Sequence, residues 1–123
     1  MTKKEITICG KTVTLAYCFA TEISYKILSD EDITKFMQDC ISSVQEETMP
    51  DTRHSIHAIL AAQSAYYESV GQPAPLTDED LMYNASPLEI GTALGTLIAL
   101  RAEFYHIPAA EPKDKEEGDG SKN

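Results

Sequence analysis

The chain has 123 residues, of which 42% are hydrophobic, a composition typical of one soluble globular domain. Its 20 acidic residues outnumber its 10 basic ones and give a net charge of −10 at pH 7. Such a charge repels the phosphates of nucleic acids and of anionic lipids, so we expect neither nucleic acid nor a membrane as a partner.

A β-hairpin is predicted for residues 4–17. Apolar residues alternate with polar ones on both sides of a glycine, as they do in strands that have one buried face. We expect a two-residue turn at Gly10 and Lys11, with the glycine first, which sets Ile8 opposite Val13. A hairpin is marginally stable alone, so its apolar face should pack on helices.

Helices are predicted for most of residues 18–108. Three amphipathic stripes follow one another, each with apolar residues spaced by three and four. Ser29 is expected to cap the second helix, Asp51 or Thr52 the third, and Pro50 to separate the two. The residues expected on the apolar sides are Ala16, Phe19, Ala20, Ile23 and Ile27, then Ile33, Phe36, Met37, Cys40, Ile41 and Val44, then Ile56, Ile59, Leu60, Tyr66, Tyr67 and Val70.

The last helix, over residues 86–106, is predicted to be the buried helix on which the others pack. It starts with a Ser N-cap, a Pro at the first position and a Glu three residues after the cap. Residues 90–100 carry no charge, but the run is too short to span a membrane. Gly91 and Gly95 leave room for a neighbouring backbone, either within the domain or in self-association.

The order of these elements predicts an α+β fold that is mostly helical. An N-terminal β-hairpin precedes a bundle of four to five helices, including a short one that starts at residues 77–80. We assign residues 1–108 to this single domain. Residues 109–123 have no apolar residue after two initial alanines, so we predict a disordered acidic tail.

The three cysteines indicate a reducing compartment. Cys9, Cys18 and Cys40 show no paired spacing, and residues 1–20 lack the apolar core of a secretory signal. We therefore expect a cytoplasmic protein with free thiols that serve mainly as small apolar side chains.

His54 and His57 come closest to a metal-binding pair. Their spacing of three places both rings near one face of a helix, where they could reach one ion. No third ligand is evident, and the favoured interpretation is two exposed histidines at the start of a helix. No motif for a nucleophile, a phosphate loop or a dinucleotide site occurs, so we expect no cofactor, metal or catalysis.

Five residues are candidates for binding a partner. Tyr66, Tyr67 and Tyr83 are included because tyrosine is enriched at protein interfaces. Gly91 and Gly95 are included because they allow close approach of another helix. For the adjacent pair of tyrosines, packing at the edge of the core is the simpler interpretation.

Four segments together resemble the tail assembly chaperones of long-tailed bacteriophages and prophages. Residues 6–15 (ITICGKTVTL) are similar to the family's opening strand, Gly-Lys turn and second strand, and residues 19–23 (FATEI) to the apolar helix that follows. Residues 57–66 (HAILAAQSAY) resemble its Ala- and Leu-rich helix, and residues 75–81 (PLTDEDL) its acidic link to the last helix. The similarity covers most of residues 4–105.

The resemblance implies a non-enzymatic helper in the bacterial cell. Members of this family coat the tape-measure protein, keep its apolar helices soluble and help to recruit tail-tube subunits. We therefore expect a tape-measure protein and a tail-tube protein as partners. Self-assembly into a homo-oligomer is a further expectation, because a hairpin with exposed edges can extend the sheet of a neighbour.

Two other functions are compatible with the sequence. The charge of −10 would suit an acidic nucleic-acid mimic that inhibits a DNA-binding protein, although several carboxylates lie at helix starts rather than along one face. A small metal-dependent enzyme built on His54 and His57 is the second alternative.

Overall fold

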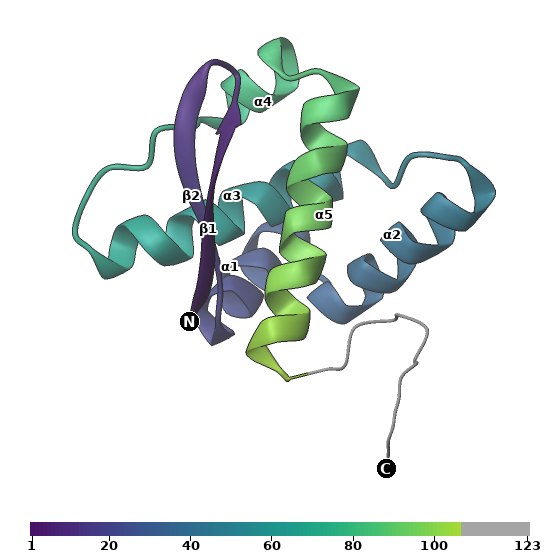
Figure 1. Ribbon diagram of the computed structural model, residues 1–123, viewed down its shortest axis with the longest axis horizontal. Coiled ribbons are helices and arrows are strands. Elements are labelled where there is room, and N and C mark those ends of the chain that lie inside the picture. The colour runs from purple at the N-terminus through teal and green to yellow at the C-terminus, as the bar shows by residue number, and fades with distance from the viewer. Residues whose placement is uncertain (107–123) are drawn as a thin grey trace, which may run out of the picture.

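Two antiparallel strands open the chain, β1 (Thr2–Ile8) and β2 (Lys11–Tyr17), and helices follow them (Figure 1). The computed structural model describes residues 1–106, and within this range the fold is α+β and mostly helical, as predicted. The predicted tail at residues 109–123 lies outside the described residues. The five helices of the described range are α1 (Phe19–Ser29), α2 (Ile33–Glu46), α3 (Thr52–Ser69), α4 (Asp78–Asn84) and α5 (Pro87–Phe104).

The hairpin forms, but its turn lies one residue earlier than predicted. Cys9 and Gly10 are the two central residues, and both have positive φ, at 54° and 72°. This geometry is typical of the type I′ turns that match the twist of paired strands. The strand pairing therefore sets Ile6, not Ile8, opposite Val13. Each residue of β2 thus pairs with a residue of β1 two places before the predicted one. A shift by two residues leaves the same side chains facing the core.

The central helix is α3, and the prediction that α5 holds this place was wrong. α3 packs against α1, β2, α4 and α5, whereas α5 covers mainly the hairpin and α3. Five consecutive residues of α3, from Ser55 to Ile59, are buried, so this helix is enclosed on nearly all sides. Gln63, farther along, is also buried and uses its side chain to bond the backbone of Leu76. In the sequence these polar residues suggested a more exposed helix, because the hydrogen-bond partners that allow their burial are not evident there.

α1 presents the predicted apolar stripe to solvent rather than to the core. Phe19 and Ile23 are each 61% exposed and Ile27 is 76% exposed, while Thr21 and Tyr25 on the opposite side are buried. The helix begins at Phe19, so Ala16 belongs to β2 and not to the stripe. The spacing of apolar residues correctly indicated a helix but not the side on which the core lies.

α2 buries its apolar face only in its first part. Ile33, Phe36, Met37 and Cys40 are buried as predicted, whereas Ile41 and Val44 are exposed. α2 extends beyond the neighbouring elements at its C-terminal end, where it lies apart from α5 in Figure 1. Its N-cap is Asp32, whose side chain accepts a hydrogen bond from the Thr34 N–H, and not Ser29 as predicted.

The other helix boundaries follow local signals that the sequence shows. Asp51 caps α3, and Thr77 and Ser86 each form a capping box at the starts of α4 and α5. Gly71, with φ of 68°, lies just after α3 in the left-handed conformation that often follows a helix. Val70 before it is exposed, contrary to the prediction that it packs in the core.

Candidate functional site

An apolar groove lies between the start of α3, α4, the start of α5 and the connection that follows α2. Its volume is about 540 Å³. None of the described residues that line it carries a charge, although the chain as a whole is strongly acidic. Its lining includes Met49, Ile56, Leu81, Met82, Tyr83 and Ile90.

The groove has a buried floor and an exposed rim. Ile56 and Leu81 are 5% and 3% exposed and belong to the hydrophobic core. Met49, Met82 and Tyr83 are 57%, 48% and 79% exposed, so their side chains are accessible to a partner. Methionine is unbranched and adapts to irregular apolar surfaces, and tyrosine supplies a large contact area with a polar end.

The hairpin turn fixes the two helix starts that form one side of the groove. The Lys11 ammonium lies 3.0 Å from a carboxylate oxygen of Asp80, which also closes the capping box of α4. The Cys9 N–H donates a hydrogen bond to Glu89, which closes the capping box of α5. These contacts hold α4 and α5 in place and leave Tyr83 free to project from α4.

Only one of the five predicted partner-binding residues lines the groove, and it is Tyr83. Tyr66 and Tyr67 are half-buried near the other end of α3 and stack edge to face on each other. The Thr14 N–H donates a hydrogen bond to the Tyr67 hydroxyl, and Lys3 lies over the Tyr66 ring. Both tyrosines therefore support the hairpin, as the packing interpretation expected.

Gly91 and Gly95 do not pack closely against any element of the described chain. Both are exposed on α5, and a Cβ atom placed on either glycine would meet no neighbouring atom within 4 Å. The expectation that they let two helices of this domain approach closely was therefore wrong. The buried side of α5 is formed by Ala93, Leu94, Leu97 and Leu100.

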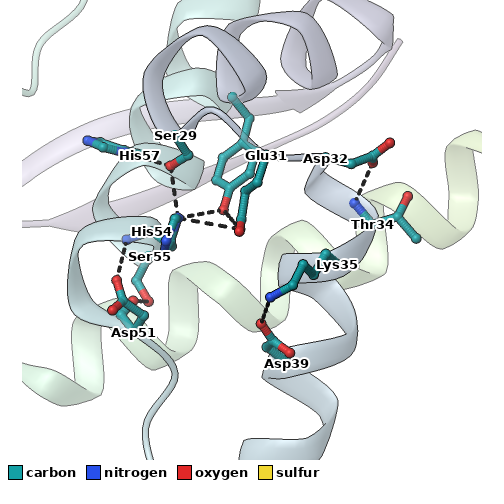
Figure 2. Close-up of polar contacts among 11 residues, drawn as sticks. Ser29, Glu31, Asp32, Thr34, Lys35, Asp39, Asp51, His54, Ser55 and His57 are labelled. Atoms are coloured by element: carbon teal, nitrogen blue, oxygen red, sulfur yellow. Dashed lines mark hydrogen bonds and ion pairs between the residues drawn. The ribbon is translucent and has the colours of Figure 1, made fainter.

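The two histidines belong to a polar cluster at the junction of α1, α2 and α3 (Figure 2). His54 Nδ1 lies 3.1 Å from the Tyr25 hydroxyl, 3.1 Å from Ser29 Oγ and 3.4 Å from the Glu31 carboxylate. His57 Nδ1 lies 2.6 Å from the same Ser29 Oγ. His57 is buried and His54 half-buried, so the interpretation of two exposed histidines was wrong.

This cluster has the geometry of a structural network. Burial lowers the pKa of His57, and the nearby Arg53 lowers it further. Within residues 1–106, no three His, Cys, Asp or Glu side chains gather in positions that could hold a metal ion. The two imidazoles instead share one hydroxyl, which ties the end of α1 to the start of α3.

The three cysteines are free thiols. Cys40 is buried on α2, and desolvation raises the pKa of its thiol to about 11. Desolvation, with the nearby Glu89 and Asp80 carboxylates, also raises the pKa of Cys9. Both thiols therefore form the nucleophilic thiolate even less readily at neutral pH than an ordinary cysteine does.

A second apolar surface, the α1 stripe, consists of Phe19, Ile23 and Ile27. It borders a crevice of about 360 Å³ between α1 and the beginning of α2, where Glu22 and Lys26 are the charged residues contributed by α1. The sequence revealed the stripe but assigned it to the core. No sequence signal indicated the groove, because Met49 and Tyr83 are far apart in the sequence and only the fold brings them to one surface.

Comparison of the chain with protein-family models, with curated proteins and with solved structures found no match. In the part of the chain that the structure describes, no helix combines the length and the apolar character that crossing a membrane requires.

Proposed function

We propose that this chain is a non-enzymatic tail assembly chaperone that binds an apolar helix of a tape-measure protein in the groove. The observation that carries the proposal is the uncharged groove with its exposed rim of Met49, Met82 and Tyr83 on an otherwise acidic protein. The resemblance of residues 4–105 to the tail assembly chaperones supplies the identity of the client.

The chemistry of the groove suits an amphipathic helix. Such helices bind through a row of apolar side chains spaced by three and four, which a groove between helices can accept. Ile56 and Leu81 provide a fixed apolar floor, and the two methionines at the rim can adjust to different side chains. A client with a long series of similar helical segments would be bound without strict sequence selectivity.

The acidic surface supports the same function. With a net charge of −10, complexes that carry many copies of the chain repel one another and stay in solution. A bound tape-measure protein would in this way be kept from aggregating before the tail tube assembles around it. Recruitment of the tail-tube protein is part of the same proposal and rests on the resemblance.

The test is co-expression with the tape-measure protein from the same genome, followed by co-purification. The wild-type chain should keep the client soluble and elute with it. Met82→Glu and Tyr83→Glu place a charge at the rim of the groove and should weaken binding at least about tenfold, which corresponds to about 1.4 kcal/mol. Val70→Glu, at an exposed apolar position at the other end of α3, is the matched control. An insoluble client beside a folded wild-type chain would refute the proposal.

A further inference from the structure

A small pocket adjoins the groove between α3 and α4, and its volume is about 220 Å³. The linings of the pocket and the groove have three residues in common, which are Thr52, Ile56 and Met82. A helix that fills the groove therefore has the pocket beside it. Unlike the groove, the pocket is lined by ionisable side chains, Arg53 and His57 from α3 and Asp78 from α4.

We infer that this pocket binds the side-chain carboxamide of a glutamine or asparagine on the helix that occupies the groove. The inference rests on the proposed function for the identity of that helix, whereas the pocket and its selectivity belong to the chain alone. A carboxamide bound here would fix the register of the helix, because an apolar row by itself fits the groove in more than one position.

His57 presents one ring nitrogen to the pocket. The residue is only 9% exposed, and its Nδ1 lies 2.6 Å from Ser29 Oγ. Within residues 1–106 Nε2 has no hydrogen-bond partner, yet it is not enclosed by protein atoms, so it opens onto the pocket that the ring lines. Figure 2 shows the His57 ring pointing away from the rest of the cluster. A polar atom of a buried residue that lacks a protein partner points to a ligand or to water.

The hydrogen-bond network places the proton of His57 on Nε2. The Tyr25 hydroxyl donates to Glu31, so His54 Nδ1, which faces both groups, must itself carry a proton. Ser29 then accepts from His54 and donates its own proton to His57 Nδ1. Because burial lowers the pKa of His57, the ring is neutral at pH 7 and its single proton lies on Nε2. His57 therefore supplies a hydrogen-bond donor to the pocket.

Arg53 and Asp78 add a second donor and an acceptor. Arg53 precedes His57 by one turn of α3, and Asp78 lies in the first turn of α4. Burial and the Arg53 charge lower the pKa of His57, whereas the Asp78 charge raises it, so both charged side chains lie near the ring. Neither forms an ion pair with the other or with any other group of residues 1–106. Both remain able to bond a ligand.

A carboxamide is the group that complements these side chains. Its oxygen can accept from the His57 Nε2–H or from Arg53, while its NH₂ can donate to Asp78. A carboxylate would instead face the Asp78 charge, and an ammonium would face Arg53. A hydroxyl has a single atom for both roles, whereas the donors lie on α3 and the acceptor on α4. The pocket is large enough, since one water molecule takes only about 30 Å³.

NMR of the histidine side chains in isotopically labelled protein tests the position of the proton. At neutral pH the His57 ring should show the tautomer that is protonated on Nε2. A proton on Nδ1 would overturn the inference, because His57 would then offer the pocket an acceptor in place of a donor.

Titration with small probes of similar size tests the selectivity of the pocket. Propionamide should move the His57 signals at millimolar concentrations and bind at least about fivefold more tightly than propionate, propylammonium or propanol. Asp78→Asn removes the charge that repels a carboxylate, so propionate should gain affinity in this variant. Glu79→Gln removes the neighbouring charge of α4, outside the pocket lining, and should keep the wild-type selectivity. No response to propionamide, or an equal response to propionate in the wild type, would overturn the inference.

These measurements need no client protein, so they separate this inference from the proposed function. Selective propionamide binding by a chain that fails to bind the tape-measure protein would support the carboxamide pocket and refute the identity of the client. Co-purification of the client with a chain that binds no propionamide would leave the chaperone function in place and overturn the pocket.

Discussion

The backbone N–H of Cys9 donates a hydrogen bond to a carboxylate oxygen of Glu89 at 3.1 Å, across 80 positions of sequence. The other carboxylate oxygen accepts a hydrogen bond from the Ser86 N–H in the capping box of α5. One side chain therefore closes the start of α5 and attaches it to the hairpin turn. Cys9 lies in the turn, outside the strand pairing, so its N–H is available to the start of α5.

Replacing Glu89 should therefore destabilise the protein in a pH-dependent manner. The hydrogen bonds from the Ser86 and Cys9 N–H groups lower the pKa of Glu89. A carboxylate with a lowered pKa contributes stability above its ordinary pKa, and this contribution is lost as pH falls through the pKa of the folded state. We expect Glu89→Gln to lower the thermal midpoint by several degrees at pH 7, and the difference from wild type to shrink below about pH 4. Thermal unfolding followed by circular dichroism at several pH values measures both effects.

Glu103→Gln is the matched control for this experiment. Glu103 lies exposed in the last turn of α5, away from the hairpin turn. Its replacement removes the same charge without the capping contacts and should leave the midpoint nearly unchanged. An equal loss of stability in both variants would show that net charge, and not the link between the turn and α5, is responsible.

The hairpin illustrates how much the sequence could predict. The alternation of apolar residues was sufficient for the two strands and for the side that faces the core. The turn was placed one residue too late, because a non-glycine residue, Cys9, occupies a left-handed conformation. That conformation is held by a contact with Glu89, which no local pattern contains.

Gln63 completes the backbone hydrogen bonding of the connection between α3 and α4. Its side-chain nitrogen donates to the Leu76 carbonyl at 2.8 Å, and its side-chain oxygen accepts from the Leu76 N–H at 2.9 Å. Both residues are buried. We expect Gln63→Leu, which keeps a similar volume, to cost about 2–4 kcal/mol, since two backbone groups lose their partners. Urea unfolding measures this cost, and Ser64→Ala, beside it at a more exposed position, should change stability by less than about 0.5 kcal/mol. If Gln63→Leu leaves the free energy of unfolding unchanged, water must take over the hydrogen bonds to the Leu76 backbone.

The same contact explains why the sequence did not identify α3 as the central helix. Buried Ser55, His57 and Gln63 gave it a polar appearance, while α5 has an uncharged run of eleven residues, 90–100. Each of these residues has a hydrogen-bond partner: Ser55 bonds the Asp51 carbonyl at the start of its own helix, while His57 and Gln63 bond other segments. The uncharged run of α5 is instead exposed along the side that contains Gly91 and Gly95. Composition alone cannot distinguish a buried helix that contains bonded polar residues from an uncharged helix with one exposed side.

His57 should make stability depend on pH near neutrality. Burial lowers its pKa below the ordinary value of 6.5. Between these two pKa values the unfolded chain binds a proton that the folded chain does not, so the free energy of unfolding rises with pH. The contribution is fully present above about pH 6.5 and is lost as pH falls toward the pKa of the folded state.

A His57→Gln variant tests this dependence. We expect it to flatten the slope of unfolding free energy against pH between about pH 5 and 7, measured by urea unfolding. His106→Gln, at an exposed position after α5, should keep the slope of the wild type. A slope unchanged in His57→Gln would assign the pH dependence to another group of the cluster.

The two apolar surfaces mark the limit of prediction from sequence. The residues of the α1 stripe were identified as one helical face, yet the core lies on the opposite side, around Tyr25. The fold covers α1 there because Tyr25 packs on Phe36 and bonds Glu31. Tyr83 was selected as a surface tyrosine, but its neighbours in the groove come from three other segments and could not be foreseen.

Gly95 offers a test of whether the outer side of α5 is free in the isolated chain. It lies within the helix, and a Cβ atom there would meet nothing within 4 Å. Alanine costs less conformational entropy than glycine in a helix, so Gly95→Ala should raise the free energy of unfolding by about 0.5–1 kcal/mol. Gly71→Ala is the informative contrast, because φ of 68° there disfavours any side chain, and it should lower stability. Urea unfolding of the two variants measures both signs. A destabilising Gly95→Ala would mean that this face of α5 is covered in solution.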